Sequence, residues 1–226
     1  MKLVLASRNA HKAREFAALL DGIDVLALPG DVELPPETGE TFASNALPKA
    51  ITAARATGHA AFADDSGIEA AALGGAPGVR SARFAGEHAS DADNLAKLIA
   101  EAPPGTPLAY VCVIALVDPQ TGDQRTFEGR CTGTMAAAPR GSGGFGYDPI
   151  FVPDDRDDGR TMAEVTQAEK DAISHRGRAA RALLAHVRAT AAPGTAAPVP
   201  GAVSPDPGAV SPDPGTAART GRRGLA

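Results

Sequence analysis

The strongest constraint on the fold is a pair of long strand-like runs on either side of a single turn. Residues 108–117 and 124–135 flank the segment Asp118-Pro119-Gln120-Thr121-Gly122. Aspartate, proline and glycine favour a turn, while apolar and β-branched residues on both sides favour strands, so this pattern predicts an antiparallel β-hairpin. The hairpin supplies two neighbouring strands to any sheet that the rest of the chain forms.

Strands and helices are mixed along the rest of the first 190 residues. Short apolar runs predict strands over residues 2–6, 23–28, 60–63 and 149–152, and helical spacing predicts helices over residues 10–20, 41–57, 91–101 and 175–188. The inward face of the last helix is expected to consist of Ala180, Leu183, Leu184 and Val187. Pro48 lies inside the second helix, and because interior proline costs about 3 kcal/mol, we expect that helix to bend or to start late. Together the elements predict an α/β fold with a mixed β-sheet flanked by helices.

The composition changes abruptly near residue 190. From there to the end the chain consists mainly of Pro, Gly, Ala and Ser, and residues 201–207 recur as residues 208–214. Seven-residue repeats with frequent prolines do not bury enough apolar surface to form a core. We therefore predict one domain over residues 1–189 and a disordered tail over residues 190–226.

Charge, cysteine content and hydropathy exclude several classes of protein. No apolar run is long enough to cross a membrane, and the first strand continues directly into polar residues, unlike a signal peptide. Cys112 and Cys131 are the only cysteines and lack metal-ligand spacing, which favours a reduced, cytoplasmic setting. The net charge of −5 argues against a nucleic-acid polymer as partner, though not against a single nucleotide bound with its own metal.

Two adjacent carboxylates stand out as candidates for chemistry. Asp64, Asp65, Ser66 and Gly67 follow the apolar stretch over residues 60–63, which predicts a strand that ends in an acidic turn at the rim of a sheet. One or two carboxylates suffice for Mg²⁺ when a substrate phosphate supplies further oxygens. The alternative is a solvated Asp-Asp turn that caps the next element.

Two further segments favour a phosphate site. Residues 7–12 lie between the first strand and the first helix, where free amides at a helix N-terminus, a hydroxyl and a lysine can bind phosphate. Asn45 and Lys49 lie on the second helix, and the lysine either reaches a phosphate from there or lies on a solvated face.

Two segments near the C-terminal part of the domain favour a site for a flat base. Phe145 stands among glycines, so its ring is either a stacking platform or a core side chain in a turn. Lys170, His175 and Arg176 bring three potential donors together before Gly177, and they either read a purine edge or lie on the surface.

The motifs SRNAHK, ADDSG, GGAPGVRSAR, GGFGYDPIF and EKDAISHRG occur in this order over residues 1 to about 188. In this the chain resembles the inosine triphosphate pyrophosphatase family, the RdgB-type XTP/dITP diphosphatases. The resemblance implies Mg²⁺-dependent hydrolysis of ITP, dITP and XTP to the monophosphate and pyrophosphate, which cleanses the nucleotide pool before incorporation into DNA and RNA. It also implies an elongated α/β fold of two lobes with the active-site cleft between them, and a homodimer.

The resemblance also implies roles for individual residues. Asp65 is implied to be the proton acceptor and a magnesium ligand, and Ser66 to contact substrate. The implied triphosphate-binding residues are Ser7, Arg8, Asn9, Ala10, His11 and Lys12. The implied base pocket consists of Phe145, Gly146, Tyr147, Asp148, Lys170, His175 and Arg176.

One position departs from the family pattern. Some relatives carry a second acidic metal ligand where this chain has Pro36, so Glu37, Asp64 or water is left as the second ligand. Three other functions compete with the resemblance: a pyrophosphatase for pyrimidine or modified-base nucleotides, a catalytically silent nucleotide sensor, and a phosphorylated-aspartate receiver. The retention of Lys12, Asp65 and Ser66 together disfavours the silent sensor.

Overall fold

A six-stranded mixed sheet in the order β2-β1-β3-β4-β5-β6 organises residues 1–191, the part of the chain that the computed structural model describes. β1 (Lys2–Leu5) pairs in parallel with β2 (Asp24–Ala27) and β3 (Ala61–Ala70). The antiparallel half consists of β3, β4 (Pro107–Val117), β5 (Gln124–Met135) and β6 (Phe151–Pro153). The predicted mixed sheet and its hairpin, β4 with β5, are confirmed.

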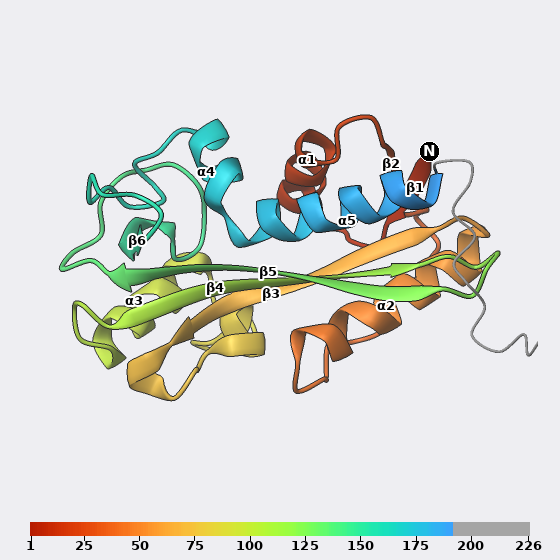
Figure 1. Ribbon diagram of the computed structural model, residues 1–226. Helices are drawn as coiled ribbons and strands as arrows, with labels where there is room; N and C mark the ends of the chain where they lie inside the picture. Colours follow the sequence, from red (N-terminus) through yellow and green to blue (C-terminus); the bar gives the residue numbers. More distant parts are fainter. Residues whose placement is uncertain (192–226) are drawn as a thin grey trace, which may run out of the picture. The chain divides into compact units, whose positions relative to one another are not determined.

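Helices cover both faces of this sheet (Figure 1). One face carries α1 (Ala10–Leu19), α4 (Gln167–Ile173) and α5 (His175–Ala191), and the other carries α2 (Phe42–Thr57) and α3 (Asp91–Glu101). Three short 3₁₀ helices complete the unit, η1 (Ala71–Leu73), η2 (Gly78–Arg83) and η3 (Asp148–Ile150). The predicted inward face of α5 is confirmed, because Ala180, Leu183, Leu184 and Val187 all lie in the buried core.

The alternation of side chains along the strands separates two cores. Leu3, Leu5 and Phe62 pack with α1 and α5, whereas Val4 and Ala61 pack with α2. A third buried cluster, which includes Ile68, Leu98, Tyr110, Ile150 and Phe151, lies at the far end of the long strands. The sheet therefore separates one core on each face and joins both to the third cluster at the far end of its long strands.

α2 runs from Phe42 to Thr57 with Pro48 inside it, so of the two expected outcomes, a bend or a late start, the late start is wrong. Thr41 and Ser44 form a capping box at its first turn, and Gly58 ends it in the left-handed conformation with φ of 68°. Its buried alanines, among them Ala46 and Ala50, pack on β1 and β3. This packing offsets the hydrogen bond that the proline removes.

The acidic run does not lie in a turn, which corrects the reading of residues 60–67. β3 continues through it to Ala70, and Asp64, Asp65 and Ser66 pair with Ile114, Val113 and Cys112 of β4. Aspartate and glycine are poor strand formers, but a long partner strand overrides that preference through cross-strand pairing.

The described part of the chain ends with α5. α5 extends to Ala191, two residues beyond residue 189, and the remainder of the predicted tail lies outside the described residues. No helix within residues 1–191 has the length and apolar character needed to cross a membrane.

Candidate active site

A cavity of about 520 Å³ opens beside β3, just beyond the point where β1 ends. β1 pairs with β3 only as far as Phe62, so the next residues of β3 have a free edge on that side. Ligands in open α/β sheets commonly bind where neighbouring strands diverge in this way. Of the residues to which the family resemblance assigned a role, all except Ala10 and Lys170 line the cavity.

At the free edge of β3, backbone groups form hydrogen bonds with side chains instead of with a neighbouring strand. Lys49 Nζ donates to the carbonyl oxygen of Asp64 at 2.8 Å, and the amide of Ile68 donates to Ser81 Oγ at 2.8 Å. Because both partners come from the α2 side of the sheet, the edge keeps its hydrogen bonds without closing the cavity. The direction of Lys49, which the sequence left open, is thereby into the site.

Asp64 and Asp65 point to opposite faces of the sheet, because successive side chains of a strand alternate. Asp65 faces α2, where Asn45 Nδ2 donates to Asp65 Oδ2 at 2.9 Å. Burial raises the pKa of Asp65, the Asn45 bond opposes that effect, and the negative charge of Glu37 raises it further. A buried carboxylate with a raised pKa is well suited to accept a proton.

Asp64 faces α1 and α5 and is fully buried among cations. Lys12 Nζ lies 3.0 Å from Asp64 Oδ1, and Arg176 Nη2 lies 3.5 Å from Asp64 Oδ2. Burial raises the pKa of Asp64, but the positive charges of Lys12, Arg176 and Lys49 outweigh it and lower the pKa to about 2. Asp64 therefore organises two cationic side chains and does not share the face of Asp65.

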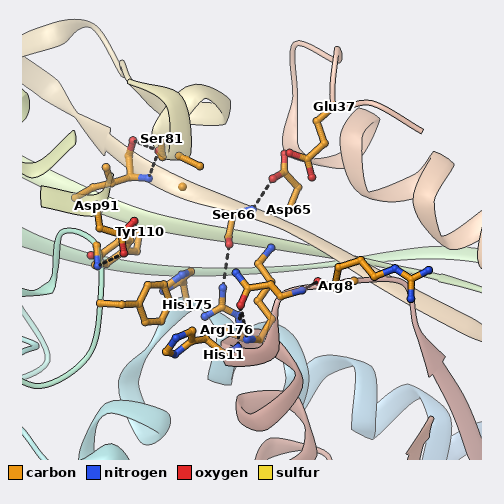
Figure 2. Close-up of a pocket in the computed structure, with 18 of the residues that line it drawn as sticks. Arg8, His11, Glu37, Asp65, Ser66, Ser81, Asp91, Tyr110, His175 and Arg176 are labelled. Carbon is orange, nitrogen blue, oxygen red and sulfur yellow. Dashed lines mark hydrogen bonds between the residues drawn. The ribbon is translucent and has the colours of Figure 1, made fainter. Parts of the chain in front are cut away.

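Glu37 is the carboxylate that joins Asp65 on the α2 side, and Figure 2 shows the two near one another. Lys49 Nζ contacts Glu37 Oε1 at 2.5 Å. Residues 1–191 contain no cluster of three or more histidine, cysteine or acidic side chains with metal-ligand geometry. The pair still fits Mg²⁺, which usually takes one or two carboxylates and keeps waters and phosphate oxygens. A divalent cation would also relieve the repulsion that raises the pKa of Asp65.

The turn between β1 and α1 presents side chains more than free amides. Asn9 caps α1, and its Oδ1 already accepts the amides of His11 and Lys12 at 2.9 and 3.2 Å. The Asn9 amide likewise donates to Ser7 Oγ. The ammonium of Lys12 and the hydroxyl of Ser7 are therefore the groups of this turn best placed for a phosphate.

Asp148 fixes the glycine-rich loop at the other end of the cavity. Its carboxylate accepts hydrogen bonds from the amide of Phe145 at 2.9 Å, from Tyr110 Oη at 3.1 Å and from Lys170 Nζ at 2.6 Å. Lys170 Nζ also lies 4.7 Å from the centroid of the Phe145 ring. Lys170 and Asp148 thus hold the loop that carries Phe145 in place. Lys170 itself does not line the cavity.

His175 and Arg176 begin α5 and are both buried. The His175 ring stacks on Tyr110 with centroids 4.7 Å apart, and among the described residues its Nδ1 has no hydrogen-bond partner. Burial, together with the charges of Arg176 and Lys170, holds the pKa of His175 well below its usual value, so the ring is neutral. Arg176 donates to Glu15 and, at 3.0 Å, to Ser66 Oγ (Figure 2).

Comparison with known proteins places this arrangement in a family. The model of the Ham1 family matches residues 3–186. The chain belongs to the Ham1 family. It is 49% identical over 201 residues to the dITP/XTP pyrophosphatase of Mycobacterium bovis, which covers 84% of this chain and 97% of that protein.

Two further relatives of this Ham1 family chain are also similar over most of its length. The dITP/XTP pyrophosphatase of Symbiobacterium thermophilum is 50% identical over 184 residues, or 79% of this chain and 90% of that protein. The structure of a HAM1 protein from Coxiella burnetii superposes with a TM-score of 0.75 at 41% identity, covering 84% of this chain and 99% of that one. The family resemblance and the fold predicted from the sequence are confirmed.

Glu15 and Tyr110 are site residues of this Ham1 family chain that the sequence did not single out. Glu15 bonds to Arg176 across 161 positions of the chain, and Tyr110 bonds to Asp148 across 38. Each lies within an ordinary helix or strand pattern, so no local signal distinguished them. Only contacts between distant elements show what they do.

Proposed function

We propose that this chain is a nucleoside triphosphate pyrophosphatase that hydrolyses ITP, dITP and XTP to the monophosphate and pyrophosphate with Mg²⁺. The observation that carries the proposal is one cavity with a carboxylate pair, Asp65 and Glu37, at one end and an aromatic platform beside His175 at the other. A nucleoside triphosphate has the matching parts, a metal-binding phosphate chain and a flat base. The names of the relatives support the same substrate class.

At the phosphate end, Asp65 accepts a proton from the attacking water. The water oxygen bonds to the α-phosphorus, the bond from the α-phosphorus to the bridging oxygen breaks, and pyrophosphate leaves. Lys12 and the hydroxyls of Ser7 and Ser66 orient the phosphate oxygens and offset their charge. Asp65 and Glu37 would hold Mg²⁺, which would supply further positive charge to offset that of the phosphate oxygens.

At the base end, Phe145 supplies a face for stacking and His175 supplies a neutral ring nitrogen. Hypoxanthine and xanthine carry a carbonyl oxygen at the 6-position, which accepts a hydrogen bond from a donor on His175 or Arg176. Adenine carries an amino group there, which is itself a donor. When ATP binds, neither that amino group nor the facing donor of the protein has a hydrogen-bond partner. Such mismatches lower kcat/KM by up to about 10⁴-fold in sites built around one hydrogen bond.

From the resemblance we also infer the setting of the enzyme. We propose that it acts in the cytoplasm as a homodimer, that it removes deaminated purine nucleotides before they enter DNA and RNA, and that residues 1–189 form its catalytic domain. Light scattering of the purified full-length chain tests the homodimer, since a monomer and a dimer differ two-fold in mass.

A pyrophosphate-release assay tests the reaction. The purified chain is supplied with ITP, XTP, dITP, GTP, ATP and CTP, each with Mg²⁺ or with a chelator. We expect turnover of ITP, XTP and dITP far above that of ATP and CTP, and its loss in the chelator. Preference for a pyrimidine nucleotide would favour the competing pyrophosphatase, and binding of ITP without release of pyrophosphate would favour a silent sensor.

A further inference from the structure

We propose that Arg8 is a positioning residue that fixes the loop after β2 and thereby places Glu37 beside Asp65, instead of binding the triphosphate. The proposal rests on the proposed function in one respect, namely that Glu37 serves the metal and phosphate end of the cavity. It reassigns Arg8, which sequence resemblance grouped with the phosphate-binding residues.

The guanidinium of Arg8 is engaged by backbone carbonyls. Nη1 donates to the oxygen of Leu28 at 2.9 Å, and Nη2 lies within hydrogen-bond distance of the oxygens of Pro29, Gly30 and Val32 at 2.7, 3.2 and 2.8 Å. Figure 2 shows the side chain extending away from Ser66 and Arg176. Four carbonyls thus converge on the two terminal nitrogens of one planar cation and fix the direction of the Arg8 side chain towards the loop.

The loop needs such a partner because it lies beyond the sheet. β2 ends at Ala27, and the backbone of residues 28–32 follows without a neighbouring strand. The bond from the Val32 amide to the Pro29 oxygen, at 3.2 Å, is a local turn that leaves the other carbonyls to be satisfied. An arginine satisfies several carbonyls at once because it carries five donors in a rigid plane, whereas a lysine is a compact point donor.

The same loop continues into the catalytic cavity. Leu34, Pro35 and Glu37 line the cavity a few residues after Val32. The downstream end is held by two hydrogen bonds. Arg83 Nη2 donates to the backbone carbonyl oxygen of Glu37 at 3.2 Å, and the Gly39 amide donates to Asn45 Oδ1 at 2.7 Å.

Arg8 therefore closes the upstream end of a segment whose downstream end is tied to the Asp65 site. It directly precedes Asn9, the cap of α1, so one side chain connects the phosphate turn with the acidic loop. If that connection is removed, the segment is held only at its downstream end and by the contact of Lys49 with the Glu37 carboxylate, so we expect that carboxylate to sample more positions relative to Asp65.

Two variants separate positioning from phosphate binding. Arg8→Met keeps most of the stem and removes all donors, and Arg8→Lys keeps the charge but supplies only a point donor. Arg55→Met is the matched control, because Arg55 is exposed in the last turn of α2, remote in sequence from the loop. Hydrogen exchange of the metal-free, nucleotide-free protein is measured for residues 28–40, with residues 107–135 as an internal reference.

We expect both Arg8 variants to accelerate exchange in residues 28–40 by about tenfold or more, with the reference strands and Arg55→Met unchanged. We also expect both to raise the Mg²⁺ concentration that gives half-maximal ITP hydrolysis. The exchange result stands even if the chain does not hydrolyse ITP, so failure of the proposed function is recognised separately. If Arg8→Met does not fold, Arg8→Lys gives the same comparison.

The opposite pattern would overturn the proposal. If Arg8 binds phosphate directly, exchange in the loop is unchanged, Arg8→Met raises KM for ITP at least tenfold, and Arg8→Lys restores most of the affinity through its charge. Unchanged exchange in both variants is sufficient by itself to reject the positioning role.

Discussion

Two neighbouring, equal-sized substitutions should have opposite consequences. Asp64→Asn is expected to destabilise the protein, and Asp65→Asn is expected to abolish turnover while leaving the fold intact. The reason is that the two carboxylates lie on opposite faces of β3. Asp64 is buried between Lys12 and Arg176, whereas Asp65 accepts a hydrogen bond from Asn45 beside Glu37.

The cost at Asp64 follows from its pKa. A pKa of about 2, against 3.8 in the unfolded chain, corresponds to about 2.5 kcal/mol of stability at about 1.36 kcal/mol for each pKa unit. An amide there also leaves the half-buried Lys12 without its carboxylate partner and leaves the buried Arg176 with Glu15 alone, which brings the expected loss to about 3 kcal/mol. For a domain of this size that lowers Tm by about 6–12 °C.

The pH dependence has a definite sign. Because the pKa of Asp64 is lowered on folding, its contribution is complete above about pH 4 and is lost as the pH falls towards 2. The difference in stability between the parent and Asp64→Asn should therefore shrink over that interval. Burial and Glu37 raise the pKa of Asp65, so its charge disfavours the folded state at neutral pH and a neutral amide costs no stability.

The measurement is thermal and urea unfolding of both variants in metal-free buffer at pH 7, with ITP turnover measured in parallel. The reasoning is refuted if Asp64→Asn is as stable as the parent, or if Asp65→Asn loses comparable stability. Turnover by Asp65→Asn within a few-fold of the parent would show that another group accepts the proton.

Three further expectations follow from the site. His175→Ala should lower kcat/KM for ITP and XTP far more than for ATP. Phe145→Ala should weaken the binding of all purine nucleotides by a similar amount, ~1–3 kcal/mol. Steady-state kinetics with ITP, XTP, GTP and ATP separates the two outcomes. Asn45→Ala should lower kcat more than it raises KM, since it frees the Asp65 carboxylate to rotate. A chain ending at Ala191 should keep kcat/KM for ITP within two-fold, because the cavity-lining residues lie between Ala6 and Arg176.

Much of the architecture was determined by local pattern. The hairpin of β4 and β5 followed from its turn, and the inward face of α5 followed from helical spacing, because both depend on residues close in the chain. The order of the motifs likewise identified the family before any geometry was known. These features depend on residues that are close in the chain, so the sequence predicts them without information on tertiary contacts.

The tertiary structure determines which groups the side chains of the motif residues contact. The sequence placed Asp64 and Asp65 together in a turn, but pairing with β4 keeps them in a strand, and the two-residue repeat of a strand sends them to opposite faces. Arg8 belongs to the phosphate turn in sequence, yet its guanidinium donates to carbonyls that lie 20 to 24 positions away. Side-chain direction depends on which elements pack together, and that information is absent from any single segment of the chain.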